Sequence, residues 1–572
     1  MAYFLEKVKE ELGRKLGADP SSFVFPPDPA LGDLSLPMFS LAKEAGTNPV
    51  QLARVKQEEI DAMNLGTLSR CEAAGPYLNF FLSPSIFPAG VISDVRKHKG
   101  RYGNAKNDQG RRLMLEYSNG NTHKEYHIGH LRNICYADSL VHILAAAGSQ
   151  PIPVSYINDF GIHVAKTIWG LTKGSRAADF RRMIEEGQPK GLVLGTCYAV
   201  SYQEIEGDEV KKREVAEIMK NIESRQGDDY ARWQETRQWS IDYFDSIYRD
   251  LGVEFEHIFY ESEVIDEGRG IVDDLLKKGI FKRSEGAIIA DLEEYGLGVL
   301  PIIRSDGTAL YTVGDLALAS RKFSEYRLDV SVYVVDVRQS LYFKQLFKIL
   351  SLAGYTAEMI HLPYDFVALK SGMMSSRSGN VITYAEVFGE AKERAAAQTR
   401  ERHLDWTPKK IDETAEALAI AAIRFEMSKI SPEKVITFDL EEALRFDGYT
   451  AAYLQYTGAR IWSLVDKNGD FKESIGIGLD LSLLQEIKER DILSKIAQFP
   501  IVIEKSASSY DPSPLARYLF ELCQGFNDYY HGTNVGKAEP ALRRARVALA
   551  RSVAQVIKNG FALLGIRYLK EM

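Results

Sequence analysis

The chain of 572 residues has no long apolar run, which sets aside the membrane-spanning classes of protein. No segment approaches the roughly 18 consecutive apolar residues that a transmembrane helix requires. The first residues, MAYFLEKVKEELGRKLG, follow an amphipathic helical pattern with acidic residues, and they lack the apolar core and cleavage site of a signal peptide. We therefore expect no membrane association and a cytoplasmic location.

Cysteine is also scarce, and its spacing argues against a zinc site or a disulfide framework. No two of the four cysteines stand in the CxxC spacing of a zinc knuckle. They are Cys71, Cys135, Cys197 and Cys523. Such separated cysteines are typical of an intracellular enzyme, and we expect no resident metal ion.

An excess of positive charge is absent as well, since the formal net charge at pH 7 is −8. This value neither indicates nor excludes nucleic-acid binding, because an acidic protein can carry one basic face. The segment from ALRRARVALARSVAQVIKNG to IRYLKEM, residues 541–572, is locally basic. Taken alone, this segment is most simply a solvated helix face.

The order of the patterned segments predicts four regions and no internal repeat. Residues 1–109 combine helices with the apolar strand GPYLNFFLS, and they end in a connecting helix and a polar link. Residues 110–384 alternate strands with helices, which favours a parallel, doubly wound sheet, and they carry a charged helical insertion at about 171–250. Residues 385–435 are predicted to form a helical connector and residues 436–572 a C-terminal helical domain. The expected strands of the sheet are LMLEYSN, PIPVSYIND, GAIIADL, LPIIRS, SVYVVD and HLPYDFVAL.

The segment KEYHIGHLRN, residues 124–133, follows the first of these strands and begins a helix. Its two histidines allow three interpretations: half of a zinc site, ordinary core histidines, or a site for phosphate. A zinc site needs at least three protein ligands, and no third ligand is apparent nearby. A helix N-terminus at the first crossover of a parallel sheet favours an anion, and Gly129 permits close backbone approach. The imidazoles can donate hydrogen bonds to a triphosphate.

A second polar loop, KSGMMSSRSGNVITY at residues 370–384, directly follows the last expected strand. Ser375, Ser376, Arg377 and Ser378 supply donors for phosphate oxygens. Alone, this loop fits an ordinary surface turn equally well. Two such loops at strand ends of one open sheet are typical of a nucleotide site.

Together the two loops resemble the paired signatures of class I aminoacyl-tRNA synthetases, and their surroundings resemble the arginyl-tRNA synthetase family. EYSNGNTHKEYHIGHLRN is similar to that family's first signature, and DGTALYTVGDLALA, VVDVRQSLYFKQLF and MSSRSGNVI are similar to later ones. RFDGYTAAYLQYTGARIWSL and NGFALLGIRYLKEM resemble its anticodon-binding domain, and GDLSLPMFSLAKEAGTNPVQLA and GPYLNFF its N-terminal domain. The resemblance implies a Rossmann-like catalytic domain between a small α+β domain and an all-α helical bundle.

This resemblance implies an arginine–tRNA ligase that activates L-arginine with ATP and transfers it from arginyl-adenylate to the 3′ end of tRNA(Arg). AMP and pyrophosphate would be released. Mg²⁺ is expected to accompany ATP, and tRNA is expected to be required for the first step. A monomer without an editing domain is expected.

The resemblance also implies site residues at the matching positions. Arginine binding is expected from Glu116, Asn121, His127, Tyr311, Asp315 and Gln339. ATP binding is expected from His127, Gly129, His130, Met374 and Ser375, and catalysis from Lys124, His127, His130, Ser375, Ser376 and Arg377. Independently, a guanidinium has five donors in a planar fork, which calls for carboxylate and tyrosine oxygens. Tyr311 and Asp315, four residues apart, would share one helix face.

The second loop departs from its class pattern, Lys-Met-Ser-Lys-Ser. This chain reads Met373, Met374, Ser375, Ser376 and Arg377 there, so neither lysine is present. Lys124 stands just before the first signature, where the family is thought to supply the missing charge, and Arg377 could add another. Our hypothesis is that Lys124 neutralises charge on the ATP phosphates.

Three alternatives stay open at the level of sequence. A cysteinyl enzyme would need zinc-binding cysteines, and a glutamyl enzyme would need basic residues in place of Glu116 and Asp315. An RNA-binding paralogue without activity would not need the full set of site residues. A different nucleotidyltransferase would have no reason to carry the C-terminal helical domain.

Overall fold

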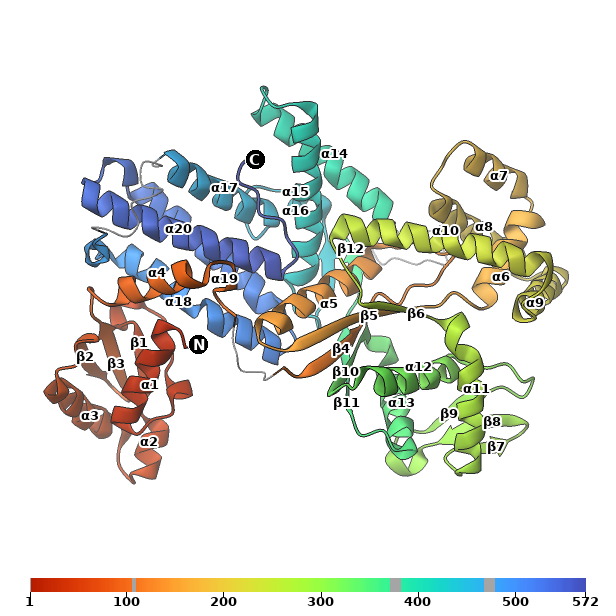
Figure 1. Cartoon of the computed structure of the whole chain (residues 1–572), viewed down its shortest axis with the longest axis horizontal. Helices are drawn as coiled ribbons and strands as arrows, with labels where there is room; N and C mark the ends of the chain where they lie inside the picture. Colours follow the sequence, from red (N-terminus) through yellow and green to blue (C-terminus); the bar gives the residue numbers. More distant parts are fainter. Residues whose placement is uncertain (1, 105–109, 371–381, 468–478) are drawn as a thin grey trace.

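The structure of the protein is a computed structural model that describes residues 2–104, 110–370, 382–467 and 479–572. Figure 1 shows the N-terminal unit and the C-terminal helices at one end of the molecule and a helical insertion at the other, with a parallel sheet between them. The α/β class that the sequence predicts, with an N-terminal α+β region and a C-terminal helical region, is therefore confirmed.

The N-terminal unit is built on an antiparallel sheet in the order β1-β3-β2. Its elements are α1 (Phe4–Leu16), β1 (Leu34–Pro37), α2 (Phe39–Glu44), α3 (Pro49–Met63), β2 (Leu68–Ala74) and β3 (Tyr77–Leu82). Leu78, Phe80 and Leu82 alternate along β3 and are all fully buried, as expected of a strand with one face on a core. Helix α4 (Phe87–His98) then connects this unit to the rest of the chain.

Five parallel strands form the central sheet in the order β11-β10-β4-β5-β6. They are β4 (Arg112–Glu116), β5 (Gln150–Ile157), β6 (His257–Tyr260), β10 (Val330–Asp336) and β11 (Glu358–Tyr364). The chain runs outward from β4 to β6 and then returns to β10 on the other side of β4. The strand order therefore reverses between β4 and β10, and ligands of open α/β sheets bind outside the carboxyl ends of strands at such a point.

Helices between β5 and β6 form the insertion that the charged sequence predicts. They are α6 (Ile162–Thr172), α7 (Ala177–Glu185), α8 (Lys190–Ile205), α9 (Glu209–Glu223) and α10 (Gly227–Leu251). Trp169 of α6 and Trp233 of α10 are buried in a core of the insertion itself. The insertion begins at Ile162, somewhat before the expected boundary near residue 171.

Two of the expected strands lie outside the parallel sheet, so that part of the prediction is wrong. GAIIADL and LPIIRS correspond to β8 (Ala287–Asp291) and β9 (Val299–Ile303), which pair antiparallel in a separate sheet with β7 (Lys282–Ser284). A short connection between consecutive strands favours antiparallel pairing, because parallel strands need a crossover of a dozen or more residues. Helix α11 (Glu261–Lys277) precedes this sheet, and α12 (Tyr311–Tyr326) and α13 (Ser340–Ala353) flank β10 in the chain.

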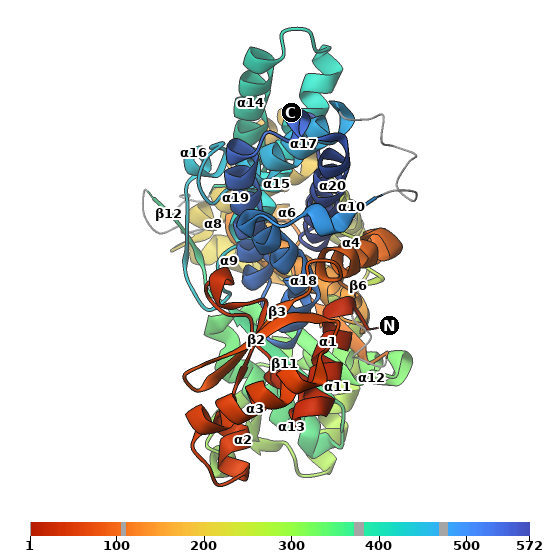
Figure 2. The same cartoon turned by 90° about the vertical axis from the view of Figure 1, so that its left-hand side faces the viewer.

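The described residues from 382 onward are mainly helical, as the sequence predicts. Its helices are α14 (Tyr384–Arg402), α15 (Pro408–Ser428), α16 (Leu440–Ala443), α17 (Ala451–Lys467), α18 (Ile487–Ser508), α19 (Ser513–Gly532) and α20 (Pro540–Leu563). The expected strand HLPYDFVAL divides after β11, and its end forms β12 (Val367–Leu369), which pairs with β13 (Ile436–Phe438). In Figure 2, α4 lies beside α18 and α20, and it contacts both. In the described ranges, no helix is long and apolar enough to cross a membrane.

Candidate active site

The predicted phosphate-binding segment caps the N-terminus of α5 (Ile128–Ala146), the helix that follows β4. Nδ1 of His127 accepts a hydrogen bond from the Gly129 N–H group at 3.1 Å, and Nδ1 of His130 accepts one from the His127 N–H group at 3.1 Å. A neutral imidazole with an accepting Nδ1 carries its proton on Nε2. Each ring therefore keeps one N–H donor for a ligand, and the ring centroids are 3.9 Å apart.

Both imidazoles are uncharged at neutral pH. Burial, reinforced by the charge of Lys124, lowers the pKa of His127 to about 4. Burial and the neighbouring His127 and Lys124 lower the pKa of His130 well below its ordinary value. The positive potential at this edge of the sheet therefore comes from Lys124 and from the N-terminus of α5 rather than from the histidines.

Gly129 gives the backbone room between the two imidazoles. A Cβ atom at this position would lie 2.9 Å from Cε1 and 3.0 Å from Nδ1 of His127. Any side chain would therefore displace the His127 ring from its capping position. Glycine at position 129 therefore keeps the His127 ring in place. This agrees with the predicted role of Gly129 in a phosphate site.

The downstream end of the second predicted loop lies directly against the first histidine segment. The N–H group of Ile128 donates to the carbonyl of Ile382 at 3.2 Å, and that of Tyr384 donates to the carbonyl of Tyr126 at 2.8 Å. Thr383 pairs with His127 in an antiparallel bridge. Met374, Ser375, Ser376 and Arg377, which were predicted to bind ATP or to act in catalysis, lie outside the described residues.

Lys124 lies at the contact between the catalytic sheet and the helical insertion. Its Nζ is 4.9 Å from the ring centroid of Tyr198 on α8. Its positive charge also lowers the pKa of His163 at the start of α6, together with the larger effect of burial. Lys124 thus stands near His127, His130 and His163, and its contact with ATP phosphates stays a prediction.

Tyr311 and Asp315 lie on the first two turns of α12, as their spacing predicts. Tyr311 is 67% exposed. Asp315 accepts a hydrogen bond from the hydroxyl of Tyr342, whose ring packs edge-on against Tyr311. Burial raises the pKa of Asp315 to about 7. Gln339 is exposed at the end of a short 3-10 turn after β10, at the same edge of the sheet.

Sequence reasoning missed a second carboxylate beside Asp315. Glu261 is the first residue of α11, and burial together with the charges of Asp159 and Asp315 raises its pKa to about 8. A carboxyl group whose pKa is raised by burial and by another acid is a candidate for binding a cation. In the sequence, Glu261 is the acidic residue that ends the segment HIFYE. It was missed because β6, the strand that brings it to this edge of the sheet, was not predicted.

Glu116 and Asn121 lie at the carboxyl end of β4. The carboxylate of Glu116 is buried, pairs with the ammonium of Lys322 and accepts a hydrogen bond from the Asn119 side chain at 2.8 Å. Asn121 is half-buried, and its backbone bridges Asn158 after β5. A carboxylate has about four lone-pair sites, so Glu116 keeps acceptor capacity for a ligand.

Within the part of the chain that the structure describes, no three His, Cys, Asp or Glu side chains cluster as metal ligands. The carboxyl ends of β4, β5, β6 and β10 instead gather neutral imidazoles, buried carboxyl groups and the ammonium groups of Lys124 and Lys322. Neutral donors beside a helix N-terminus suit phosphate, and buried carboxyl groups suit a guanidinium.

Comparison with known families decides the assignment. The model described as "tRNA synthetases class I (R), catalytic domain" matches residues 91–436. The model "Arginyl tRNA synthetase N terminal domain" matches residues 3–82, and "DALR anticodon binding domain" matches residues 454–572. The chain belongs to the arginyl-tRNA synthetase family.

Relatives and solved structures of arginyl-tRNA synthetases support this assignment over the whole chain. The arginine–tRNA ligase of Bdellovibrio bacteriovorus is 33% identical over 95% of this chain and 93% of its own length. That of Clostridium perfringens is 31% identical over 99% of both chains. The Thermus thermophilus arginyl-tRNA synthetase structure covers 99% of both chains with a TM-score of 0.81 and 26% identity.

The expected activity is therefore confirmed: the chain is an arginine–tRNA ligase (EC 6.1.1.19). Its class I catalytic domain uses ATP, arginine is its substrate, and its C-terminal domain binds the anticodon of tRNA(Arg). The cysteinyl, glutamyl and other nucleotidyltransferase alternatives do not account for matches to the arginyl N-terminal model and to the class I (R) catalytic model in one chain.

Proposed function

We propose that the neutral histidine pair at the N-terminus of α5 binds the ATP phosphates and that the carboxyl groups on α11 and α12 bind the arginine guanidinium. The observation that carries this proposal is the reciprocal capping by His127 and His130, which leaves both Nε2–H groups as donors at the point where the strand order reverses. Donors already fixed in place need no reorganisation as charge develops on a phosphate.

The reaction proceeds in two steps. The arginine carboxylate attacks the α-phosphate of ATP and pyrophosphate leaves, and then the terminal ribose hydroxyl of tRNA(Arg) attacks the acyl carbonyl and AMP leaves. Lys124 and the N-terminus of α5 offset phosphate charge in the first step. Neither step requires a protein nucleophile, because positioning and electrostatic stabilisation supply the rate.

The guanidinium is bound by Asp315 and Glu261, with Tyr311 and Gln339 as polar neighbours. Each carboxyl group has a raised pKa and gains its charge when a cation arrives. Such a site rejects uncharged analogues strongly, because it would leave buried carboxyl groups unpaired. Glu116, Asn121 and His127 then contact the arginine main-chain groups.

Mg²⁺ enters this site with ATP. The described residues hold no cluster of three potential protein ligands, and phosphate oxygens and water supply most ligands of magnesium in nucleotide sites. The chain's own residues would contribute the surrounding donors rather than a dedicated cage. When bound, the ion offsets charge on the ATP phosphates.

Four regions divide the work: residues 1–109 contact the tRNA elbow, residues 110–384 catalyse, residues 385–435 connect, and residues 436–572 hold the anticodon. The protein acts as a cytoplasmic monomer.

ATP–pyrophosphate exchange with each of the twenty amino acids, with and without tRNA(Arg), tests the proposal. Exchange with arginine alone and only with tRNA is expected, and exchange with another amino acid or silence with arginine would contradict it.

A further inference from the structure

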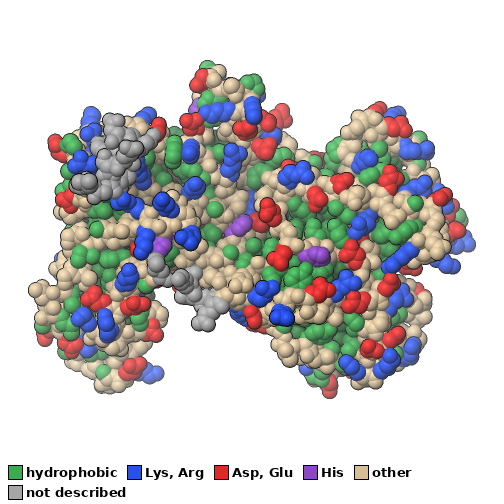
Figure 3. All heavy atoms as spheres, in the orientation of Figure 1, with side chains coloured by type: hydrophobic (Ala, Val, Ile, Leu, Met, Phe, Trp, Pro, Cys, Tyr) green, Lys and Arg blue, Asp and Glu red, His purple; other side chains and the backbone are tan. Residues whose placement is uncertain are grey.

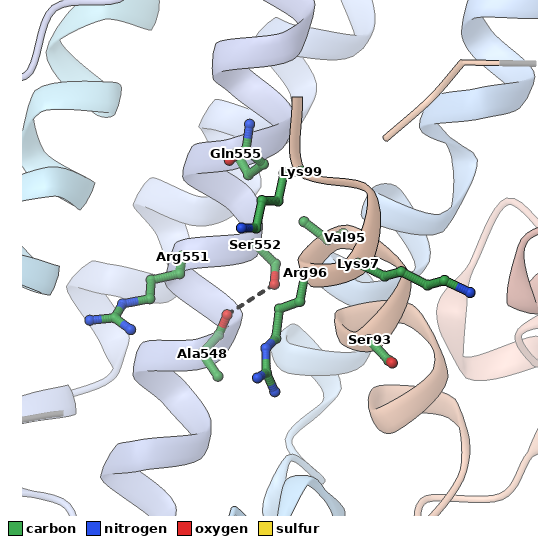
Figure 4. A pocket seen from close by; sticks show the side chains of 9 residues that line it. All are labelled: Ser93, Val95, Arg96, Lys97, Lys99, Ala548, Arg551, Ser552 and Gln555. Carbon is green, nitrogen blue, oxygen red and sulfur yellow. Dashed lines mark hydrogen bonds between the residues drawn. The ribbon is translucent and has the colours of Figure 1, made fainter. Parts of the chain in front are cut away.

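A basic cavity lies between the connecting helix α4 and the C-terminal helix α20, far along the chain from the catalytic residues. Its volume is about 670 Å³. It is lined by Ser93, Val95, Arg96, Lys97, Lys99, Ala548, Arg551, Ser552 and Gln555 (Figure 4). Four of these residues are cationic, and no acidic residue is among the described residues that line it. The two helices contact each other, so the cavity is part of the folded molecule.

The cations of this cavity come from both of the segments that border it, Arg96, Lys97 and Lys99 from one side and Arg551 from α20. Arg551 has its pKa lowered by burial and by the charge of Arg96 on the facing helix. Among the residues that the structure describes, Lys97, Lys99 and Arg551 form no ion pair with a carboxylate. Like positive charges gathered on one surface attract an anion, which is the arrangement of a phosphate-binding surface.

The backbone fixes the position of Lys99 in this cavity. The Asn559 side chain of α20 donates hydrogen bonds to the carbonyls of Lys99 at 2.8 Å and of Tyr102 at 3.0 Å. Lys99 itself has φ +49° and ψ −121°, a conformation that L-residues rarely adopt. Residues held in sparsely populated conformations persist where the surroundings over-determine them, and they cluster at ligand sites.

The surroundings favour a long anion over a small one. In Figure 3, Lys and Arg side chains gather on the face over α4 and α20. Figure 4 shows Arg96 and Lys99 between the two helices, whereas Arg551 points outward on the other side of α20, so the positive groups are spread rather than converging on one point. Spread cations suit successive phosphates of a nucleic-acid backbone better than one free phosphate.

We propose that the cavity between α4 and α20 binds backbone phosphates of tRNA(Arg), on the stretch between the elbow and the anticodon stem. This inference rests on the proposed function, because α4 lies near the end of the region assigned to the elbow, residues 1–109, and α20 belongs to the anticodon-binding domain. Arg546 on α20 takes no part, since it is buried and paired with Glu486 and Glu489. The basic C-terminal sequence thus divides into a structural arginine and a binding one.

The test removes two charges from the cavity with Lys99→Gln/Arg551→Gln and two from a distant surface with Lys277→Gln/Lys278→Gln at the C-terminal end of α11. The affinity for tRNA(Arg) is measured between about 50 and 200 mM salt, where each phosphate contact contributes about one unit to the slope of log K against log salt. The cavity variant is expected to lose about two units of slope and about tenfold in affinity at the lowest salt. Its KM for tRNA rises equally, while kcat at saturating tRNA and the KM for arginine stay unchanged.

Three other results would overturn the proposal. One is a cavity variant with the same tRNA affinity and salt slope as the α11 control, while the wild-type enzyme charges tRNA(Arg). Another is evidence for a site that binds free phosphate. In that case inorganic phosphate raises the thermal midpoint of the wild type but not of the cavity variant, and the cavity variant binds tRNA(Arg) normally. Phosphate-ethylation interference tests the wild-type enzyme without any variant. Ethylation of tRNA phosphates between the elbow and the anticodon is expected to weaken binding. Absence of this effect also overturns the proposal. Failure of the wild type to charge tRNA(Arg) would instead contradict the proposed function.

Discussion

The ammonium group of Lys322 on α12 pairs with the carboxylate of Glu116 at the end of β4, and the two side chains are 0% and 4% exposed. Nζ of Lys322 also lies 4.1 Å from the ring centroid of Tyr333 on β10. This pair joins three elements at the carboxyl edge of the sheet. The charge of Glu116 raises the pKa of Asp315 and that of Lys322 lowers it, so the pair also influences the charge of the proposed arginine site.

Replacing Lys322 with methionine is expected to destabilise the fold strongly. It leaves Glu116 buried without its counter-charge, which costs about 3–5 kcal/mol of unfolding free energy. Glu116→Gln/Lys322→Met removes both charges and is expected to recover most of that loss. Denaturant unfolding of the three proteins measures the difference.

The double variant also separates structure from binding. If Glu116 contacts arginine, the double variant stays folded but its KM for arginine remains high. A double variant as unstable as Lys322→Met would show that the ion pair is not the source of the stability. A stable double variant with normal arginine KM would remove Glu116 from the arginine site.

Lys124→Met is expected to lower arginine-dependent ATP–pyrophosphate exchange by on the order of 100-fold, because it removes positive charge next to the ATP phosphates. The same variant is expected to raise the pKa of His127, since Lys124 helps to lower it. Exchange assays and NMR titration of the imidazole measure the two effects. Tyr198→Phe, which keeps the ring 4.9 Å from Nζ, serves as the control. Unchanged exchange in Lys124→Met would refute the charge hypothesis.

Much of the fold follows from periodicity, but one strand and one sheet do not. β6 (His257–Tyr260) has only four residues and follows a long charged insertion, so no alternating pattern announces it. β8 and β9 are apolar like the strands of the central sheet. Their sequences therefore do not reveal that they pair with each other and with β7 in a separate sheet. The missed β6 also concealed Glu261, which begins the next helix.

The candidate site likewise combines features that follow from local sequence with features that depend on contacts between distant residues. The spacing of Tyr311 and Asp315 and the glycine between two histidines are local, so sequence reasoning finds them. Lys322 lies 206 positions from Glu116, and no sequence pattern links them. His127 is neutral because segments distant in the sequence bury it. The sequence therefore identifies the imidazole as a hydrogen-bond donor but does not give its charge.

Gly129→Ala is expected to raise the KM for ATP and lower the exchange rate without unfolding the protein. The new Cβ would lie within 3.0 Å of the His127 ring and must push it from its capping position. Gly270→Ala on α11 is the matched control, because a Cβ there meets nothing within 4 Å. The control is expected to keep full activity and to gain up to about 1 kcal/mol of stability from helix propensity. Equal activity of the two variants would show that the ring position does not matter.

Arginine binding is expected to strengthen as the pH rises from about 6 to 8. Asp315 and Glu261 have pKa values of about 7 and about 8, so at the lower pH both are mainly protonated and a guanidinium must displace their protons. The guanidinium itself stays charged throughout. The dissociation constant for arginine is therefore expected to fall at least about tenfold over this range. Calorimetric titration at each pH measures it, together with the protons released on binding.

Asp315→Asn tests which group carries this pH dependence. The variant keeps the shape of the side chain but loses the charge, so its arginine KM is expected to rise roughly 30-fold or more. Its remaining pH dependence is expected to have one midpoint, that of Glu261, and to vanish in Asp315→Asn/Glu261→Gln. Tyr342→Phe, which removes the hydrogen bond to Asp315, should move the first midpoint upward, since that bond lowers the pKa of Asp315. A wild-type affinity that is constant between pH 6 and 8 would mean that neither carboxyl group binds the guanidinium, because a cation bound to a protonating acid must lose affinity as that acid is neutralised.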